Sequence, residues 1–486
     1  MDRVNLKEFR SAALTRLLEQ PLDLLVVGGG IVGAGVARDA AMRGLRAGLV
    51  EQHDLAFGTS SRSSRLLHGG IRYLAQGRLG LVHEASREKR VLARIAPHLA
   101  EPLAFVFPTF RKTPWRRWKL RIGVKMYDFL CGGHNFGPST VMDRDGALAY
   151  LPGLTDENLT GAVRYYDGLT NDSRLVLDTL RSAAAHGAII SNYTRLEEAS
   201  PQGDGWHCRV TDALAGGSYE VRARSIVNAT GPWSPSLPQA RIRLRLTKGV
   251  HLVIDRERLP VPDAVVMQDG RRILFAIPWG RRVILGTTDT DYRGLPEAVR
   301  TEPADVEYIL AVVNRCFPSA GLRPEDVRAT WAGLRPLIAR RRGKPSDITR
   351  AHKIRMPHPG WIDVAGGKLT TYRLIGQQVV HRVAKYLKRE LPRCRTAKEP
   401  LLEPEAVRGL SSIVPPDPSP ELVSHFCRNE WAVHLDDIML RRAGWHYYRD
   451  DRQSVAGEVA RWMAEVLGWD RQREEAELKG YDQAAS

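Results

Sequence analysis

The sequence predicts an α/β fold with a parallel sheet covered by helices, a second domain built on an antiparallel sheet, and a small helical C-terminal domain. Three observations predict it. Leu22–Glu51 reads as strand, glycine-rich turn, helix and strand. The stretch between Leu244 and Ile284 holds short, alternating strands separated by turns. Ser419–Gly480, which follows a segment rich in proline, is helical in pattern.

Length and composition are those of a globular protein. The 486 residues allow two or three domains, with 43% hydrophobic and 26% charged residues. No apolar run reaches the roughly 18 residues of a membrane span. Met1–Gln20 reads as a short amphipathic helix packed on the first domain, without the apolar core of a signal peptide. The five cysteines are scattered, so we expect a reducing compartment, no disulfide framework and no metal site.

The formal net charge of +17 has three explanations: an anionic lipid surface, nucleic acid, or the bias of an arginine-rich organism. No nucleic-acid motif is present, and the arginines are spread along the chain instead of clustering in one recognition helix. We therefore expect no nucleic-acid partner, and favour a membrane surface combined with background bias.

The glycine-rich turn indicates a dinucleotide. Gly28, Gly30 and Gly33 have G-x-G-x-x-G spacing between a buried apolar strand and a helix that begins at Ile31 and ends near Arg43. Glycines at these positions permit the tight turn, the approach of a pyrophosphate and close helix packing, and the helix N-terminus attracts the phosphates. Glu51 ends the second strand, where an acid binds ribose hydroxyls and disfavours a 2′-phosphate. FAD or NAD is therefore expected.

Gly58–Leu74 (GTSSRSSRLLHGGIRYL) follows the second strand and is dense in hydroxyls and glycine. Such a run can surround a polar ligand with hydroxyl and backbone donors, or it can be a solvated loop. Its position beside the dinucleotide favours the ligand.

A set of motifs now indicates a family. They are Leu22–Leu74, VNATGPW (Val227–Trp233), TKGVHLVI (Thr247–Ile254), IPWGRRVILGTTDTDY (Ile277–Tyr292), WAGLRPL (Trp331–Leu337) and VAGGKLTTYR (Val364–Arg373). In content and order the sequence resembles the FAD-dependent glycerol-3-phosphate dehydrogenases, within the D-amino-acid-oxidase-like flavoproteins. The resemblance implies a Rossmann-type FAD-binding domain with an antiparallel-sheet substrate or cap domain, followed by the helical C-terminal domain.

The implied layout divides the chain into three parts. Residues 1–391 form the oxidoreductase domain, with its FAD-binding part at about 20–100, 165–240 and 345–391 and its cap at about 101–164 and 241–344. A buried strand at Ser225–Thr230 that returns to the cofactor sheet would make the FAD domain discontinuous. Residues 392–420 read as a linker and 421–486 as the helical domain, whose arginines could face lipid, a partner or water.

The resemblance also implies noncovalent FAD, because no cysteine lies near the expected flavin site. The helix beginning near Leu369 would point its N-terminus at the flavin. The expected cofactor-binding residues are Gly28, Gly30, Ile31, Val32, Gly33, Glu51, Gln52, Thr59, Ser60, Ser61, Ser63, Ser64, Arg65, Leu66, Ala229, Thr230, Gly231, Gly366, Gly367, Lys368, Leu369 and Thr370.

The implied substrate, sn-glycerol 3-phosphate, carries a dianionic phosphate that arginines bind well. The motif match nominates Arg72, Arg335 and Lys368 as its cations, with Tyr73 and Thr287 as hydroxyl partners. Arg335 and Lys368 stand among apolar or glycine neighbours, where an unpaired charge is costly to bury.

The catalytic candidates are His251, His68 and Arg335. Both histidines fall inside matched motifs and titrate in the range of a general base, although a lone histidine is more often a structural hydrogen-bonder. Either one could take the hydroxyl proton from C2, and the residues do not decide between them.

Arg111–Leu130 is the most basic stretch, with Trp115, Trp118, Ile122, Met126 and Phe129 at helical spacing among cations. Such a helix suits an anionic membrane surface, or it is partly buried with snorkelling arginines. The resemblance implies peripheral attachment to the cytoplasmic membrane from the cytoplasm, and membrane quinone as electron acceptor.

Other functions remain open. An oxidase would give the electrons to oxygen, and a related flavoprotein would oxidise another hydroxy or amino substrate. A basic binding protein would keep flavin only for structure. The oligomeric state is open as well, with a homodimer as one option.

Overall fold

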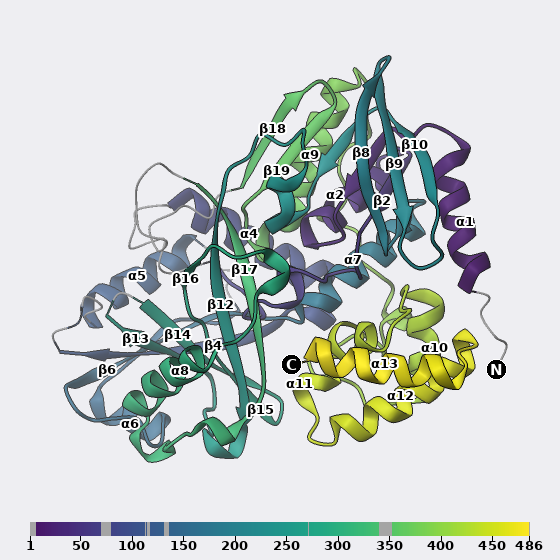
Figure 1. Cartoon of the computed structure of the whole chain (residues 1–486). Coiled ribbons are helices and arrows are strands. Elements are labelled where there is room, and N and C mark those ends of the chain that lie inside the picture. Colours follow the sequence, from purple (N-terminus) through teal and green to yellow (C-terminus); the bar gives the residue numbers. More distant parts are fainter. Residues whose placement is uncertain are drawn as a thin grey trace.

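The computed structural model describes residues 6–69, 79–111, 113, 117–130, 136–270, 272–339 and 352–485. Figure 1 shows their arrangement: a sheet with helices at the top, a second and larger sheet at lower left, and the yellow helical domain at lower right. The α/β class, the antiparallel second sheet and the helical C-terminal domain are as predicted.

The first sheet is the nucleotide side of the molecule. Its strands are β1 (Leu24–Val27), β2 (Ala47–Val50), β7 (Ile189–Ser191), β11 (Ile226–Asn228), β18 (Lys353–His358) and β19 (Trp361–Ala365). They lie in the order β18-β19-β11-β1-β2-β7, and all neighbours are parallel except β18 and β19. The sheet is thus assembled from distant segments, as the strand predicted at Ser225–Thr230 requires.

Helices on one face, and a helix with a small sheet on the other, bury these short strands on both faces, which explains their continuous apolar sequences. Helix α2 (Ile31–Met42) packs between α7 (Asp172–Ala185) and α9 (Tyr372–Tyr386). On the other side lie α1 (Leu6–Glu19) and a three-stranded sheet of β8 (Thr194–Gln202), β9 (Gly205–Asp212) and β10 (Ser218–Ala223). Leu14 and Leu17 of α1 are buried there, so this helix packs on the first domain as expected.

The second sheet is antiparallel apart from the parallel pair β13 and β4. Its described strands are β3 (Leu66–Leu67), β4 (Glu101–Phe110), β5 (Thr140–Met142), β6 (Leu159–Leu169), β12 (Leu244–Asp255), β13 (Ala264–Asp269), β14 (Arg272–Trp279), β15 (Arg282–Gly286), β16 (Thr290–Tyr292) and β17 (Val327–Ile338). The long strands β12 and β17 pair along their whole lengths and run from this sheet towards the nucleotide side (Figure 1).

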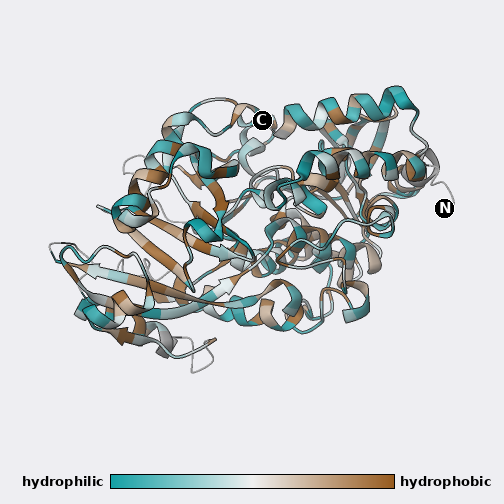
Figure 2. Cartoon of the chain, turned by 90° about the horizontal axis from the view of Figure 1, so that it is seen from below, coloured by the Kyte–Doolittle hydropathy of each residue, from teal (hydrophilic) through white to brown (hydrophobic). Residues whose placement is uncertain are grey.

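Helices cover this sheet too. They are α4 (Leu79–Ile95), α5 (Arg117–Leu130), α6 (Arg144–Tyr150) and α8 (Pro303–Cys316). Figure 2 shows brown, hydrophobic residues along many of the strands and teal, hydrophilic residues on the outer helices. The sheet therefore has its own core, with Val250, Leu252 and Ile254 of β12 at its centre.

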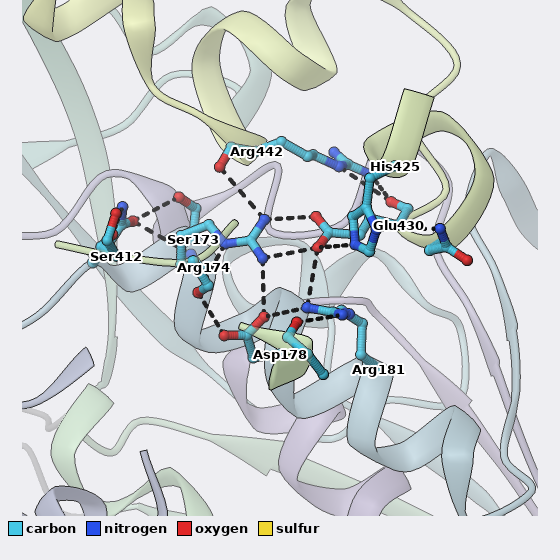
Figure 3. Close-up of polar contacts among 12 residues, drawn as sticks. Ser173, Arg174, Asp178, Arg181, Ser412, His425, Glu430 and Arg442 are labelled. Carbon is cyan, nitrogen blue, oxygen red and sulfur yellow. Dashed lines mark hydrogen bonds and ion pairs between the residues drawn. The ribbon is translucent and has the colours of Figure 1, made fainter. Parts of the chain in front are cut away.

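The helical domain holds α10 (Pro420–Asn429), a π-helical turn (Asp437–Arg442), α11 (Trp445–Tyr448), α12 (Arg452–Leu467) and α13 (Arg471–Ala485). Buried ion pairs join it to the nucleotide side. Arg174 of α7 pairs with Glu430, as Figure 3 shows, and Arg441 and Arg442 both pair with Asp54. Of the settings left open for the arginines of this domain, which were lipid, a partner and water, lipid and water do not apply to Arg441 and Arg442, because both are buried against Asp54.

The segment 392–420 is docked against the nucleotide side around residues 399–401. The guanidinium of Arg38 in α2 donates to the carbonyls of Glu399 and Pro400, at 3.0 and 2.9 Å from Nη2, and the side chain of Leu401 is buried. The predicted linker is therefore part of the packed surface of the nucleotide side.

Neither a membrane-spanning helix nor a metal site is found among the described residues. None of these helices has the length and apolarity needed to cross a bilayer. In the same residues, no cluster of three histidine, cysteine or acidic side chains could hold a metal ion.

Candidate active site

A cavity lies where the two sheets meet. From the nucleotide side it is lined by the carboxyl ends of parallel strands, including Val27, Val50 and Val364. From the second sheet it is lined by residues of β12 and β17, including His251 and Arg335. Ligands of open parallel sheets bind beyond the carboxyl ends of the strands, so the position fits a cofactor site.

The glycine turn forms one end of the cavity. Gly28 has a φ of +112°, and a Cβ atom there would come within 2.7 Å of the carbonyl oxygen of Ala229. A Cβ atom on Gly33 would come within 1.9 Å of the carbonyl oxygen of Gly28. Both positions therefore require glycine, although Gly33 supports the turn from behind and does not line the cavity.

The N-terminus of α2 is available to an anion. Gly30, Ile31 and Val32 line the cavity, no side chain caps Gly30, and the first turn of the helix has no acidic residue. Because the positive end of the helix dipole favours negative charge, this end fits the pyrophosphate of a dinucleotide.

Glu51 lies at the end of β2, where the ribose was expected. Its carboxylate accepts hydrogen bonds from the backbone N–H groups of Gly29 and His53, at 2.7 and 2.9 Å. Burial raises the pKa of Glu51, and these backbone hydrogen bonds act in the opposite direction. The carboxylate is thus fixed in place at the cavity wall.

The hydroxyl-rich segment after Gly58 bridges the two sides of the cavity. Ser60 Oγ accepts from the N–H of Ile31 at 3.0 Å, which ties the segment to the glycine turn. Thr59 Oγ1 donates to the carbonyl of Leu334 at 2.6 Å, and Ser64 Oγ lies 2.8 Å from Nε2 of His251. The segment therefore wraps the site, as favoured from the sequence.

His251 is the most enclosed titratable group at the cavity. Its side chain is 2% exposed, and its ring stacks on that of Trp331 with centroids 5.2 Å apart. Nδ1 has no hydrogen-bond partner among the described residues. Burial, reinforced by the charges of Arg335 and Arg65, holds the pKa of His251 well below its usual range. The imidazole is therefore neutral at neutral pH and able to accept a proton.

Two cations predicted to hold the substrate meet in this cavity. Arg335 donates to Thr287 Oγ1 at 2.9 Å and to the carbonyl of Thr288 at 3.1 Å. Lys368 Nζ donates to the carbonyl of Gly69 at 3.2 Å. Thr287 itself does not line the cavity but contacts Arg335, and its contact with substrate stays a prediction.

The turn after β19 forms another part of the cavity wall. Gly366 and Gly367 line the cavity with φ values of +74° and +92°. The chain then makes a 3-10 turn at Leu369–Thr371 before α9 begins at Tyr372, three residues later than predicted. Thr370 Oγ1 accepts from the backbone N–H of His68 at 3.1 Å, which brings His68 to the same wall.

The structure brings most of the predicted residues together. Those that line the cavity are Gly28, Gly30, Ile31, Val32, Glu51, Gln52, Thr59, Ser60, Ser63, Ser64, Leu66, His68, Ala229, Thr230, Gly231, His251, Arg335, Gly366, Gly367, Lys368, Leu369 and Thr370. Ser61 and Arg65 do not line it. Arg72 and Tyr73 lie outside the described residues.

Other lining residues were not predicted. Arg62 comes from the same hydroxyl-rich segment, and Phe57 and Trp233 lie within the matched motifs Leu22–Leu74 and VNATGPW. Gly249 and Gly333 face one another across β12 and β17. A Cβ atom on Gly249 would come within 2.3 Å of Arg335 Nη2, so this glycine makes room for the guanidinium. In the sequence, only the position of Gly249 within the TKGVH motif could have indicated this role.

Comparisons with known proteins agree with this arrangement. The FAD dependent oxidoreductase family matches residues 23–381, and the C-terminal domain of alpha-glycerophosphate oxidase matches residues 419–474. Glycerol-3-phosphate dehydrogenase of Mycobacterium leprae is 35% identical over 526 residues, covering 97% of this chain and 89% of its own. Aerobic glycerol-3-phosphate dehydrogenase of Staphylococcus aureus is 39% identical over 380 residues, covering 76% and 68%. The crystal structure of glycerol-3-phosphate dehydrogenase from Bacillus halodurans complexed with FAD has a TM-score of 0.78 at 29% identity, covering 98% of this chain and 96% of that one.

Proposed function

The chain belongs to the FAD-dependent oxidoreductase family, and from its glycerol-3-phosphate dehydrogenase relatives we propose that it oxidises sn-glycerol 3-phosphate to dihydroxyacetone phosphate and passes the electrons to membrane quinone. One observation carries the proposal. A neutral imidazole, that of His251, shares a single cavity with the cations of Arg335 and Lys368 and with the dinucleotide-binding turn.

The residues around the cavity fit FAD. The glycine turn and the N-terminus of α2 would hold the pyrophosphate, and Glu51 would hold the adenosine ribose. Gly366 and Gly367, whose positive φ values suit glycine, line the cavity and would bring the backbone of this turn up to the flavin ring. No cysteine is among the residues that line the cavity, so we propose noncovalent binding. When bound, FAD supplies the acceptor for the hydride that leaves C2 of the substrate.

The substrate would be held by its phosphate. Arg335 presents a planar guanidinium and Lys368 an ammonium at the cavity wall, a pair of charges that matches a dianion. The partners of Arg335, Thr287 and Thr288, fix the direction of the guanidinium before substrate arrives. Fixed cations lose little freedom on binding and orient C2 as well as retaining the phosphate.

His251 is the proton acceptor in this proposal. Loss of a hydride from C2 leaves a carbonyl only if the C2 hydroxyl also gives up its proton, and a neutral imidazole can take it. Ser64 Oγ contacts Nε2 of His251 and fixes the ring, which also stacks on Trp331. His68 lies at the same wall, but its neighbours do not enclose it to the same degree.

Helix α5 is the proposed membrane contact, and attachment to the membrane would place the protein beside membrane quinone, the proposed electron acceptor. Its buried face carries Leu120, Val124 and Tyr127. Trp118 and Ile122, with exposures of 56% and 58%, form a second apolar stripe together with Met126, at 38%. Lys119, Arg121 and Lys125 flank this stripe. Exposed apolar residues flanked by cations suit an anionic bilayer, so we place the protein at the cytoplasmic face of the membrane.

An anaerobic absorbance titration of the FAD-loaded protein tests the proposal. Glycerol 3-phosphate should bleach the visible flavin band quickly, whereas glycerol at equal concentration should bleach it far more slowly. If neither compound bleaches the band, the substrate is wrong. Readmission of oxygen or addition of a quinone analogue to the bleached protein then identifies the acceptor. Rapid recovery with oxygen alone would favour an oxidase, the function suggested by the name of the matching C-terminal domain.

A further inference from the structure

Three consecutive residues of the hydroxyl-rich segment hold the ring pair of His251 and Trp331. The carbonyl of Ser63 accepts from Trp331 Nε1 at 3.2 Å, and Ser64 Oγ contacts His251 Nε2 at 2.8 Å. The guanidinium of Arg65 then lies over the Trp331 ring, 5.2 Å from its centroid. One short segment therefore touches the hydrogen-bonding edge of the histidine and also places a cation on the tryptophan against which that histidine stacks.

The surroundings of Arg65 are unusual for a cation. Its side chain is 4% exposed, and the guanidinium lies 4.2 Å from the ring centroid of Trp279 and 5.9 Å from that of Tyr447. Nε and Nη1 have no hydrogen-bond partner in the described part of the chain, and Asp172 Oδ1 is 3.9 Å from Nε. A buried charge with so little compensation is costly. Its position beside a reactive group points to a function for the charge.

The backbone conformation explains why Arg65 is here and not in the cavity. Arg65 has a φ of +55°, in the left-handed region that residues other than glycine seldom adopt. Its N–H donates to Ser63 Oγ at 3.0 Å, and its carbonyl accepts from the N–H of Thr170. Ser64 lines the cavity, whereas Arg65 lies in the aromatic cage of Trp279, Trp331 and Tyr447.

The charges around His251 come from several elements. Arg335 on β17 and Arg65 are the two cations whose charges act on the imidazole. Each has a carboxylate on its far side: Asp289 is 3.4 Å from Arg335, and Asp172 of α7 is 3.9 Å from Arg65. Tyr447 of α11 packs against Trp331 from the helical domain, and no described carboxylate pairs with the imidazole itself.

We propose that Arg65 is a positioning residue that keeps His251 unprotonated and oriented, so that the imidazole is ready to accept the hydroxyl proton of the substrate. The proposal rests on the proposed function only for the identity of that substrate. The cation acts across the Trp331 ring, and the stack with Trp331 fixes the plane of the imidazole. Arg335 shares the electrostatic effect but has a second task, the phosphate, whereas Arg65 does not line the cavity.

The test measures the protonation of His251 directly. FAD-loaded protein with isotope-labelled histidine is titrated by NMR, and the His251→Asn variant identifies the signal. Arg65→Met, which removes the charge while keeping similar bulk, should raise the pKa of His251 by on the order of one unit. Arg65→Lys should restore the value of the unmodified protein. Asp172→Asn, which removes the opposing charge and keeps an acceptor for the N–H of Ser63, should not raise it.

Arg65→Met leaves Asp172 buried without its cation, so the double variant Arg65→Met/Asp172→Asn provides a second test that buries no unpaired charge. It too should raise the pKa of His251. An unchanged pKa in both variants, or equal shifts in Arg65→Met and Arg65→Lys, would overturn the proposal. The acidic limb of kcat/KM against pH should move upward with the NMR value.

The two proposals can fail separately. If the NMR value shifts as expected and glycerol 3-phosphate does not bleach the flavin, the role of Arg65 stands and the substrate assignment falls. If bleaching occurs and the NMR value does not move in either variant, the proposed function stands and the role of Arg65 falls.

Discussion

Arg174 of α7 and Glu430 of the helical domain form a two-fold ion pair across the boundary of their domains. Nη1 of Arg174 donates to Oε2 at 2.6 Å and Nη2 donates to Oε1 at 2.9 Å, and the side chains are 1% and 0% exposed. Asp178 and Arg181 join the same network, which Figure 3 shows to be built on one face of α7. The helical domain is therefore fixed to the nucleotide side by buried charge.

Removing one member of this pair should destabilise the protein strongly. Glu430→Gln or Arg174→Met removes the main partner of the other buried charge and leaves it only Asp178 or Arg181, so we expect a cost approaching the roughly 3–5 kcal/mol of a broken buried pair. We expect a matching loss in the free energy of unfolding by urea. The double variant Arg174→Met/Glu430→Met should lose less than either single variant, because no unpaired charge remains at the boundary. Similar losses in all three would show that shape, and not charge, holds the boundary.

The same network predicts a loss of stability in acid. Burial alone would raise the pKa values of Glu430 and Asp178, but the charge of Arg174 outweighs it and lowers both. A carboxyl group whose pKa is lowered on folding stabilises the protein above its unfolded pKa of about 4, and this contribution is lost as the pH falls further. Urea unfolding at pH 6 and then at progressively lower pH should show that loss. Its slope below about pH 4 should be smaller in Glu430→Gln.

Gly249, which leaves room for the guanidinium of Arg335, should be essential for binding the substrate. Gly249→Ala would place a Cβ atom 2.3 Å from Nη2 of Arg335, which must displace the guanidinium. We expect KM for glycerol 3-phosphate to rise by about tenfold or more, the equivalent of a lost charged hydrogen bond. Gly457→Ala on α12, where a Cβ atom meets nothing within 4 Å, is the matched control. An unchanged KM in Gly249→Ala would separate Arg335 from phosphate binding.

The nucleotide site could be predicted because its chemistry depends on local spacing. Gly28, Gly30 and Gly33 are close in sequence, and one turn followed by one helix is enough to bring them together. The cluster of His251, Arg335 and Lys368 was predicted from motifs in family order, and its geometry depends on pairing between β12 and β17. The role of Gly249 follows only from that register, which the sequence does not contain.

Other features depended on conformation or on distant partners. Arg65 was expected at the cofactor, but its left-handed backbone places it among Trp279, Trp331 and Tyr447. The partner of Arg174 lies 256 residues away in the chain, so no local pattern pointed to Glu430. Arg441 and Arg442 look like surface charges in the sequence and are buried against Asp54.

The phosphate of the substrate predicts how the two cations should behave in kinetics. Arg335→Met should lower kcat/KM for glycerol 3-phosphate by about 100-fold, and Lys368→Met by a similar factor, because each removes one charged contact with the dianion. Slow turnover of glycerol, which has no phosphate, should change little in either variant. Arg393→Met, at an exposed position on the nucleotide side, is the control for loss of positive charge alone. Equal losses for both compounds would point to a role in cofactor binding.

The exposed apolar stripe of α5, formed by Trp118, Ile122 and Met126, should be required for binding to membranes. Trp118→Ser/Ile122→Ser removes its two most exposed apolar side chains and leaves the buried face of Leu120, Val124 and Tyr127 intact, so the fold should hold. Since binding at an interface grows with buried apolar area and with attraction to anionic lipid, sedimentation with phosphatidylglycerol vesicles should weaken by about tenfold. Anaerobic bleaching by glycerol 3-phosphate should be unchanged. Leu18→Ser on α1, which Figure 1 places on the other side of the molecule, is the control, and a loss equal to that of the double variant would show that α5 is not the contact surface.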